Sequence, residues 1–117
     1  MKFKNRQTGR LAERLAAEAL IEKGYEILER NFQNRFGEID IIAKSKNILV
    51  FVEVKAKKST RFGIPEEMIN PLKIQKIRHM AELYLNGKSS LCRIDVVAII
   101  LSPQNGLLDL KHYENVY

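Results

Sequence analysis

The clearest structural signal in the chain is the stretch GEIDIIAKSKNILVFVEVK at residues 37–55. It contains two runs rich in Ile and Val, at 37–44 and 48–55, joined by a short polar link. β-branched residues favour strands, and a short polar link between two such runs favours an antiparallel turn. The stretch therefore predicts a β-hairpin.

Hydrophobic periodicity around this hairpin predicts two helices and three further strands. Apolar residues recur at helical spacing in both helical segments, and a glycine stands where each helix should end. Residues 56–65 combine three basic residues with Ser, Thr, Gly and Pro, so they are expected to form an exposed, mobile loop. We expect one α/β domain over residues 1–117, with helices at 8–23 and from Asn70-Pro71 to Gly87, and further strands at 25–32, 94–101 and 107–113.

The charge balance of the chain points to polyanionic partners. Of its 117 residues, 45% are hydrophobic and 29% are charged, which is typical of an ordered globular protein. The 20 Lys and Arg residues outnumber the 14 Asp and Glu residues, which gives a net charge of +6. Nucleic acids are natural partners for such a chain, although the same charge could merely keep it in solution.

Several classes of site and location are excluded. Cys92 is the only cysteine, so the chain forms no intrachain disulfide and no cysteine-based zinc cluster. Neither His79 nor His112 has a partner at zinc-ligand spacing. The N-terminal segment lacks the apolar stretch of a signal peptide, and the longest apolar run, 96–101, is far shorter than the roughly 20 residues that span a bilayer. We therefore expect a cytoplasmic protein with no membrane partner.

Alternation of side chains along the hairpin gathers polar groups on particular faces. In the first run, Glu38 and Asp40 should share one face while Ile39 and Ile41 share the other. In the second run, the same alternation separates the valines from the polar residues. It should place Val50, Val52 and Val54 on one face and Phe51, Glu53 and Lys55 on the opposite face.

If the two runs pair with these faces aligned, Asp40, Glu53 and Lys55 converge. Carboxylate oxygens are the ligands that Mg²⁺ and Mn²⁺ prefer, and a phosphodiester and a water can fill the remaining positions. Lys55 would orient that water or neutralise charge developing on the phosphate. The alternative is a solvated hairpin face with a surface ion pair, which would contribute only about 0–1 kcal/mol to stability. The position of Glu53 between Val52 and Val54 favours the metal site.

The strings GEID at 37–40 and FVEVK at 51–55 resemble the core motif of the PD-(D/E)XK nucleases, in the form seen in the bacterial YraN-type family. The likeness covers nearly the whole chain and includes RIDVV at 93–97, in which an ion pair between Arg93 and Asp95 is the simplest interpretation. That family is similar to archaeal Holliday junction resolvases. The resemblance implies a restriction-endonuclease-like αβββαβ core, with a central mixed sheet flanked by helices.

Carried over by position, the resemblance makes Asp40 and Glu53 ligands of Mg²⁺ or Mn²⁺ and Lys55 the catalytic lysine. It also makes Glu13 a helix carboxylate that faces the metal. Helical periodicity alone does not choose between Glu13 and Glu18, and the resemblance selects Glu13.

Basic residues behind the hairpin and at the start of the second helix are candidates for phosphate contacts. They are Lys57, Lys58 and Arg61 in the loop and Lys73 and Lys76 in the helix. The expected function is a metal-dependent endonuclease that hydrolyses phosphodiester bonds in DNA, with branched or structured DNA suggested by the resolvase likeness. That likeness also makes a homodimer a candidate assembly. The alternative is a nucleic-acid binding or interaction module with a nuclease fold that does not cut alone, and RNA fits the charge equally well.

Overall fold

The computed structural model describes residues 2–59 and 63–116 of the chain. Neither α-helix in these ranges combines the length and apolar character that a bilayer-spanning helix needs. The helices are α1 (Lys2–Glu22), the short 3-10 helix η1 (Pro65–Met68) and α2 (Pro71–Leu85). The strands are β1 (Glu26–Asn34), β2 (Gly37–Ser45), β3 (Ile48–Lys57), β4 (Leu91–Leu101) and β5 (Leu107–Tyr113).

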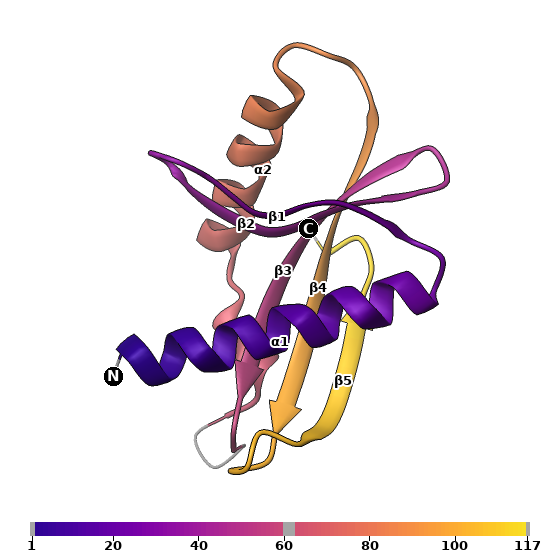
Figure 1. Cartoon of the computed structure of the whole chain (residues 1–117). Coiled ribbons are helices and arrows are strands. Elements are labelled where there is room, and N and C mark those ends of the chain that lie inside the picture. Colours follow the sequence, from indigo (N-terminus) through magenta and orange to yellow (C-terminus); the bar gives the residue numbers. More distant parts are fainter. Residues whose placement is uncertain (1, 60–62, 117) are drawn as a thin grey trace.

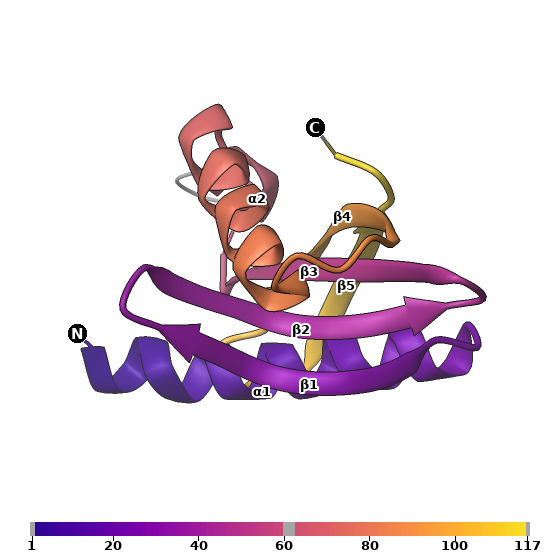
Figure 2. The same cartoon turned by 90° about the horizontal axis from the view of Figure 1, so that it is seen from above.

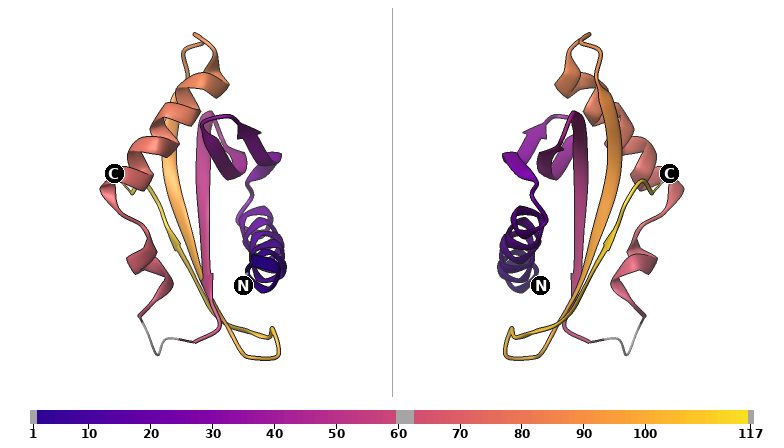
Figure 3. Two further views of the ribbon diagram at one scale, coloured as in Figure 1. Left: turned by 90° about the vertical axis from the view of Figure 1, so that its left-hand side faces the viewer. Right: turned by 90° about the vertical axis from the view of Figure 1, so that its right-hand side faces the viewer.

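The five strands form one mixed sheet in the order β1-β2-β3-β4-β5. β3 and β4 run parallel, and the other neighbouring pairs are antiparallel. Figure 1 shows α1 lying across the sheet, and Figure 3 shows the sheet between α1 on one side and α2 on the other. The predicted α/β fold, with a mixed sheet flanked by helices and the order αβββαβ before a last strand, is confirmed.

Local sequence signals explain where α2 begins and ends. Asn70 is the N-cap, because its side chain accepts a hydrogen bond of 2.9 Å from the backbone N–H of Lys73. Pro71 fills the first helical position, where the missing backbone donor costs nothing. Asn86 ends the helix in a left-handed conformation with φ of 50°. The helix predicted to run to Gly87 therefore ends slightly earlier.

Some elements are longer than the sequence predicts. α1 and β4 both begin earlier, at Lys2 and Leu91. β3 continues to Lys57, so the prediction of a loop from residue 56 is wrong at its start. The cause is the neighbouring strand, because β3 and β4 stay paired as far as Lys57 and Ile100. Local composition carries no signal of that pairing.

Two apolar cores lie on the two faces of the sheet. Val52 packs in the core that includes α1, and Phe51 packs in the core that includes α2, as strand alternation predicts. The prediction that Ile39 and Ile41 share a face is wrong, because Ile39 belongs to the α2-side core and Ile41 to the α1-side core. Regular alternation therefore fails at the residue between them, Asp40.

Both neighbours of β2 are irregular at this point. In β1, Asn31 adopts a left-handed conformation with φ of 55°, between the pairs Arg30–Ile41 and Phe32–Ile39. On the other side, the ladder of β2 and β3 ends at the pair Ile41–Val52. The alternation of side chains between the two faces of β2 is therefore interrupted at Asp40, next to the point where β2 and β3 separate.

A buried polar cluster ties the C-terminal part of the chain to the sheet. The carboxylate of Asp95 accepts a hydrogen bond of 2.9 Å from Arg93 Nε and lies 2.7 Å from His112 Nε2, and Arg93 also donates to the Tyr25 hydroxyl. Burial acts to raise the pKa of Asp95, but the hydrogen bonds from His112, Arg93 and the backbone of Asn115 outweigh it, and the pKa is lowered. The predicted ion pair of Arg93 and Asp95 is confirmed.

Replacing Asp95 with asparagine should lower the free energy of unfolding by about 2 kcal/mol, because hydrogen bonds to a buried charged group are weakened. Urea denaturation would measure the change. Asp109→Asn, a half-buried carboxylate on β5, is the matched control and should stay near the wild-type value. Equal free energies of unfolding for the two variants would show that the hydrogen bonds of Asp95 do not stabilise the fold.

Candidate active site

An open cleft of about 750 Å³ lies where α1, β2, β3 and the start of α2 meet. Figure 2 shows the two helices on either side of β2 and β3. The structure brings all four predicted catalytic residues to this cleft. They are Glu13 from α1, Asp40 from β2, and Glu53 and Lys55 from β3.

Asp40 sits at the separation of β2 and β3. Beyond the last pair, Ile41–Val52, the Asp40 side chain takes over the bonding between the strands, because its Oδ2 accepts a hydrogen bond of 2.8 Å from the backbone N–H of Val54. The residue is only 9% exposed. This bond fixes the carboxylate in the opening between the strands, where both α1 and β3 can reach it.

Three carboxylates meet at this opening. Asp40 lies next to Glu13 of α1 and Glu53 of β3, close enough for each to act on its pKa, and Glu53 is 2% exposed. Burial, followed by the charge of Glu53, raises the pKa of Asp40 to about 8, although the Val54 N–H acts in the opposite direction. Burial and the charge of Glu38 likewise raise the pKa of Glu13. The cluster therefore favours a cation or a proton among its oxygens.

Two lysines supply part of that positive charge. Lys73 Nζ lies 3.2 Å and Lys55 Nζ 3.5 Å from Oε2 of Glu53. Both lysine side chains are partly exposed to the cleft, at 35% and 25%. Lys73, predicted as a phosphate contact, thus also pairs with the predicted metal ligand Glu53 from the start of α2.

Asn31 is a member of the site to which the sequence gives no role. With its amide nitrogen toward the carboxylates, Asn31 donates to Glu13 Oε1 at 2.8 Å and to Glu38 Oε2 at 3.1 Å. Gln33 also donates to Glu38 Oε2, at 3.1 Å. Asparagine tolerates the left-handed conformation seen here better than most residues, but that tolerance does not reveal its partners. Asn31 therefore links the carboxylate of Glu13 on α1 to that of Glu38 on β2.

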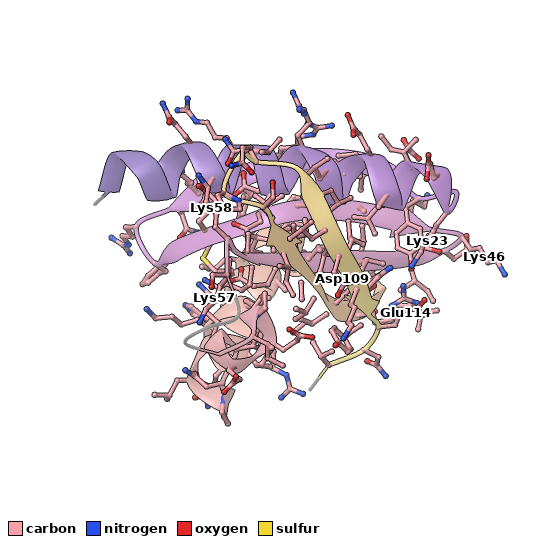
Figure 4. The ribbon with its side chains drawn as sticks, turned by 90° about the horizontal axis from the view of Figure 1, so that it is seen from below. Lys23, Lys46, Lys57, Lys58, Asp109 and Glu114 are labelled. Carbon is pink, nitrogen blue, oxygen red and sulfur yellow. The ribbon has the colours of Figure 1, made fainter. Side chains whose placement is uncertain are left out.

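The predicted phosphate contacts divide between two hollows. Lys57 and Lys58 line the cleft, and Figure 4 shows them at one end of the molecule, away from Lys23 and Lys46 at the other. Lys76 lies outside the cleft and lines a neighbouring hollow between the β1–β2 turn and α2. The predicted contact Arg61 lies outside the described residues.

The donors in the cleft fit a hard divalent cation. No three His, Cys, Asp or Glu side chains within residues 2–59 and 63–116 are already arranged around a metal position. Mg²⁺, however, is usually held by one or two carboxylates and several waters. Asp40 and Glu53 are two such carboxylates, buried and adjacent, and the described lining of the cleft contains neither His nor Cys. Asp40 and Glu53 are the residues that would hold Mg²⁺ or Mn²⁺.

The chain has many relatives along its whole length. Residues 12–99 match the family described as Uncharacterised protein family UPF0102. A UPF0102 protein from Syntrophomonas wolfei is 42% identical over 116 aligned positions, covering 97% of this chain and 99% of the relative. Others are 46% identical in Fervidobacterium nodosum, covering 96% and 83% of the two chains, and 39% identical in Dictyoglomus turgidum, covering 97% and 98%. The chain therefore belongs to UPF0102, the YraN-type family of PD-(D/E)XK nuclease-like proteins.

Proposed function

We propose that this protein is a Mg²⁺- or Mn²⁺-dependent endonuclease that hydrolyses phosphodiester bonds in DNA. The observation that carries the proposal is the meeting of Asp40, Glu53 and Lys55 in one cleft where β2 and β3 separate. An ion pair on a solvated hairpin face would leave both carboxylates exposed, whereas here both are buried. The resemblance to Holliday junction resolvases suggests branched or otherwise structured DNA as the substrate.

Each residue of the cleft has a chemical task in this proposal. Asp40 and Glu53 would hold the ion, which supplies a more acidic bound water and polarises the phosphate. Lys55, at the rim beside Glu53, orients the attacking water and neutralises charge that develops on the phosphate. Glu13 positions the carboxylate of Asp40, and Asn31 holds Glu13 in turn by the hydrogen bond to its Oε1.

The same carboxylates explain why the cleft should select cations. Burial and mutual repulsion disfavour the ionised form of Asp40, so a bound cation relieves a cost that the empty cluster carries. DNA brings negative charge as well, and Lys57 and Lys58 at the cleft offer its backbone compensating charge. The cleft therefore combines an acidic interior with a basic rim.

The test is cleavage of labelled four-way junctions, flapped duplex, blunt duplex and single strands by the purified protein, in Mg²⁺, in Mn²⁺ and in EDTA. We expect cleavage only with metal, and a loss of at least about 100-fold in Glu53→Gln. Glu18→Gln, which removes an exposed carboxylate of α1, is the matched control and should cleave normally. Cleavage in EDTA, or equal rates for the two variants, would sink the endonuclease proposal.

The alternative is a DNA-binding module that does not cut. It is favoured by the ion pairs of Glu53, whose Oε2 is already held by Lys55 and Lys73. Calorimetric titration with Mn²⁺ separates the two functions. An endonuclease should bind the ion in a manner that Asp40→Asn abolishes, whereas a pure binder should show salt-sensitive DNA affinity that this substitution does not change.

A further inference from the structure

A second hollow, of about 600 Å³, lies beside the cleft, between the β1–β2 turn and α2. Here it is called the aromatic groove, and it is defined by Phe36, Leu72, Lys73, Lys76 and His79. Lys73 lines both the aromatic groove and the cleft. The two hollows are therefore neighbours along one surface.

The ring of Phe36 is exposed and yet held in place. Phe36 is 45% exposed, and its backbone N–H donates to Asn34 Oδ1 at 2.8 Å, which fixes the turn. Its ring meets His79 edge to face, with centroids 5.1 Å apart, and the guanidinium of Arg35 lies 5.0 Å from its centroid. A ring that contributes little to the core is thus preorganised at the rim of the groove.

Charge on this surface favours an anionic partner. Arg35, Lys73 and Lys76 surround the groove, and the described residues that line it include no carboxylate. Lys73 connects the groove to the cleft, because its Nζ lies 3.2 Å from Glu53. A ligand with both negative charge and flat apolar surface suits this combination, and a nucleic-acid strand has both.

We propose that the aromatic groove binds an unpaired nucleotide of a DNA strand whose backbone continues into the cleft, with its base stacked on Phe36. A base inside a duplex is already stacked on its neighbours, so only an unpaired or splayed base can use the ring. The naming of DNA rests on the proposed function, but the binding step itself does not require cleavage.

The position of the unpaired nucleotide follows from the chain between Phe36 and Asp40. Phe36 stands in the turn just before β2 and Asp40 four residues further on, so the two are at most about 13 Å apart along the chain. Stacked nucleotides rise about 3.4 Å each, so the base on Phe36 lies a few nucleotides from the phosphate in the cleft. The substrate is therefore DNA with a single-stranded segment beside the bond to be cut, such as a flap or an opened junction, and not intact duplex.

The test measures binding of the full-length protein in EDTA, so that cleavage plays no part. Fluorescence anisotropy would compare a duplex carrying a single-stranded tail with a blunt duplex. Phe36→Ala should weaken binding of the tailed duplex by about 5- to 100-fold, the contribution of stacking one base, and leave the blunt duplex unchanged. Phe36→Trp should preserve tail binding. Leu108→Ala, 65% exposed on β5 at the far edge of the sheet, is the control and should change neither.

A second measurement locates the base. 2-Aminopurine, substituted at successive positions of the tail, should be quenched at one position by the wild-type protein and at none by Phe36→Ala. Lys76→Ala should weaken both substrates and lower the salt dependence by about one charge. The proposal would be contradicted if Phe36→Ala lost the same affinity for the tailed and the blunt duplex, or lost none for either. Quenching that survives the substitution would also contradict it.

Failure of the groove and failure of the endonuclease give different results. If Phe36→Ala weakens binding of the tailed duplex alone but no metal supports cleavage, the endonuclease proposal is wrong and the proposal that the aromatic groove binds a nucleotide is kept. If the protein cleaves DNA and Phe36→Ala binds and cleaves every substrate as the wild type does, only the proposal for the aromatic groove is wrong.

Discussion

Replacing Lys55 with alanine should slow DNA cleavage by at least about 100-fold while leaving thermal stability close to that of the wild type. The Lys55 side chain is 25% exposed, and its Nζ lies 3.5 Å from Oε2 of the buried Glu53, longer than an ordinary hydrogen bond, so folding depends little on this contact. Glu53 also keeps its closer partner, Lys73 at 3.2 Å. In the cleft, however, the ammonium group acts on charge that appears only as the phosphate reacts, so its loss raises the barrier.

Single-turnover cleavage assays and thermal unfolding would measure the two quantities on the same preparation. Lys55→Arg keeps the charge but changes the donor geometry, so it should recover part of the lost rate. Lys46→Ala is the matched control, because Lys46 is exposed in the β2–β3 turn at the other end of the molecule (Figure 4). A Lys55→Ala protein that cleaves as fast as Lys46→Ala would remove Lys55 from the catalytic group.

Replacing Asp40 with asparagine should stabilise the metal-free protein and abolish its stabilisation by Mn²⁺. Burial and the charge of Glu53 raise the pKa of Asp40 to about 8, so the folded protein carries a cost for ionising this group that the unfolded chain does not. Asparagine removes the cost and still offers Val54 an oxygen acceptor in place of the 2.8 Å bond. The gain at pH 7 should be on the order of 2–4 kcal/mol in the free energy of unfolding.

The pH dependence has a definite sign. The folded pKa of Asp40, about 8, lies above its ordinary value of 3.8, so between these values the folded state binds the proton and the unfolded state does not. The contribution of Asp40 to stability is therefore most favourable below about pH 4, falls as the pH rises to about 8, and is constant above that. Because a cation must displace this proton, the affinity for Mn²⁺ should rise over the same range.

Thermal unfolding across this pH range, in EDTA and in Mn²⁺, measures both effects. The wild type should lose stability with rising pH in EDTA and recover it with Mn²⁺, whereas Asp40→Asn should show a flatter profile and no response to the metal. Asp109→Asn removes a carboxylate of β5 outside the cleft and should behave as the wild type. A lower unfolding temperature for Asp40→Asn in EDTA at pH 7 would contradict the cost assigned to Asp40.

Local sequence determined most of the elements of this protein, and together with the family likeness it predicted four residues of the cleft. The Ile- and Val-rich runs of residues 37–55 predict the hairpin, and Asn70 with Pro71 predicts the start of α2, because strand propensity and helix capping act over a few residues. Strand alternation, together with the likeness to PD-(D/E)XK proteins, selected Asp40, Glu53 and Lys55, and all three line one cleft. Their catalytic roles stay predictions.

Tertiary structure alone decided how that cleft is arranged. The left-handed Asn31 and the separation of β3 from β2 turn the strand at Asp40, so Ile39 and Ile41 face different cores. The pairing of Lys73 with Glu53, the bonds from Asn31 to Glu13 and Glu38, and the contact of Phe36 with His79 each join different elements of the fold. Such contacts depend on the twist and register of neighbouring strands and on the docking of the helices, and periodicity within one segment does not encode them.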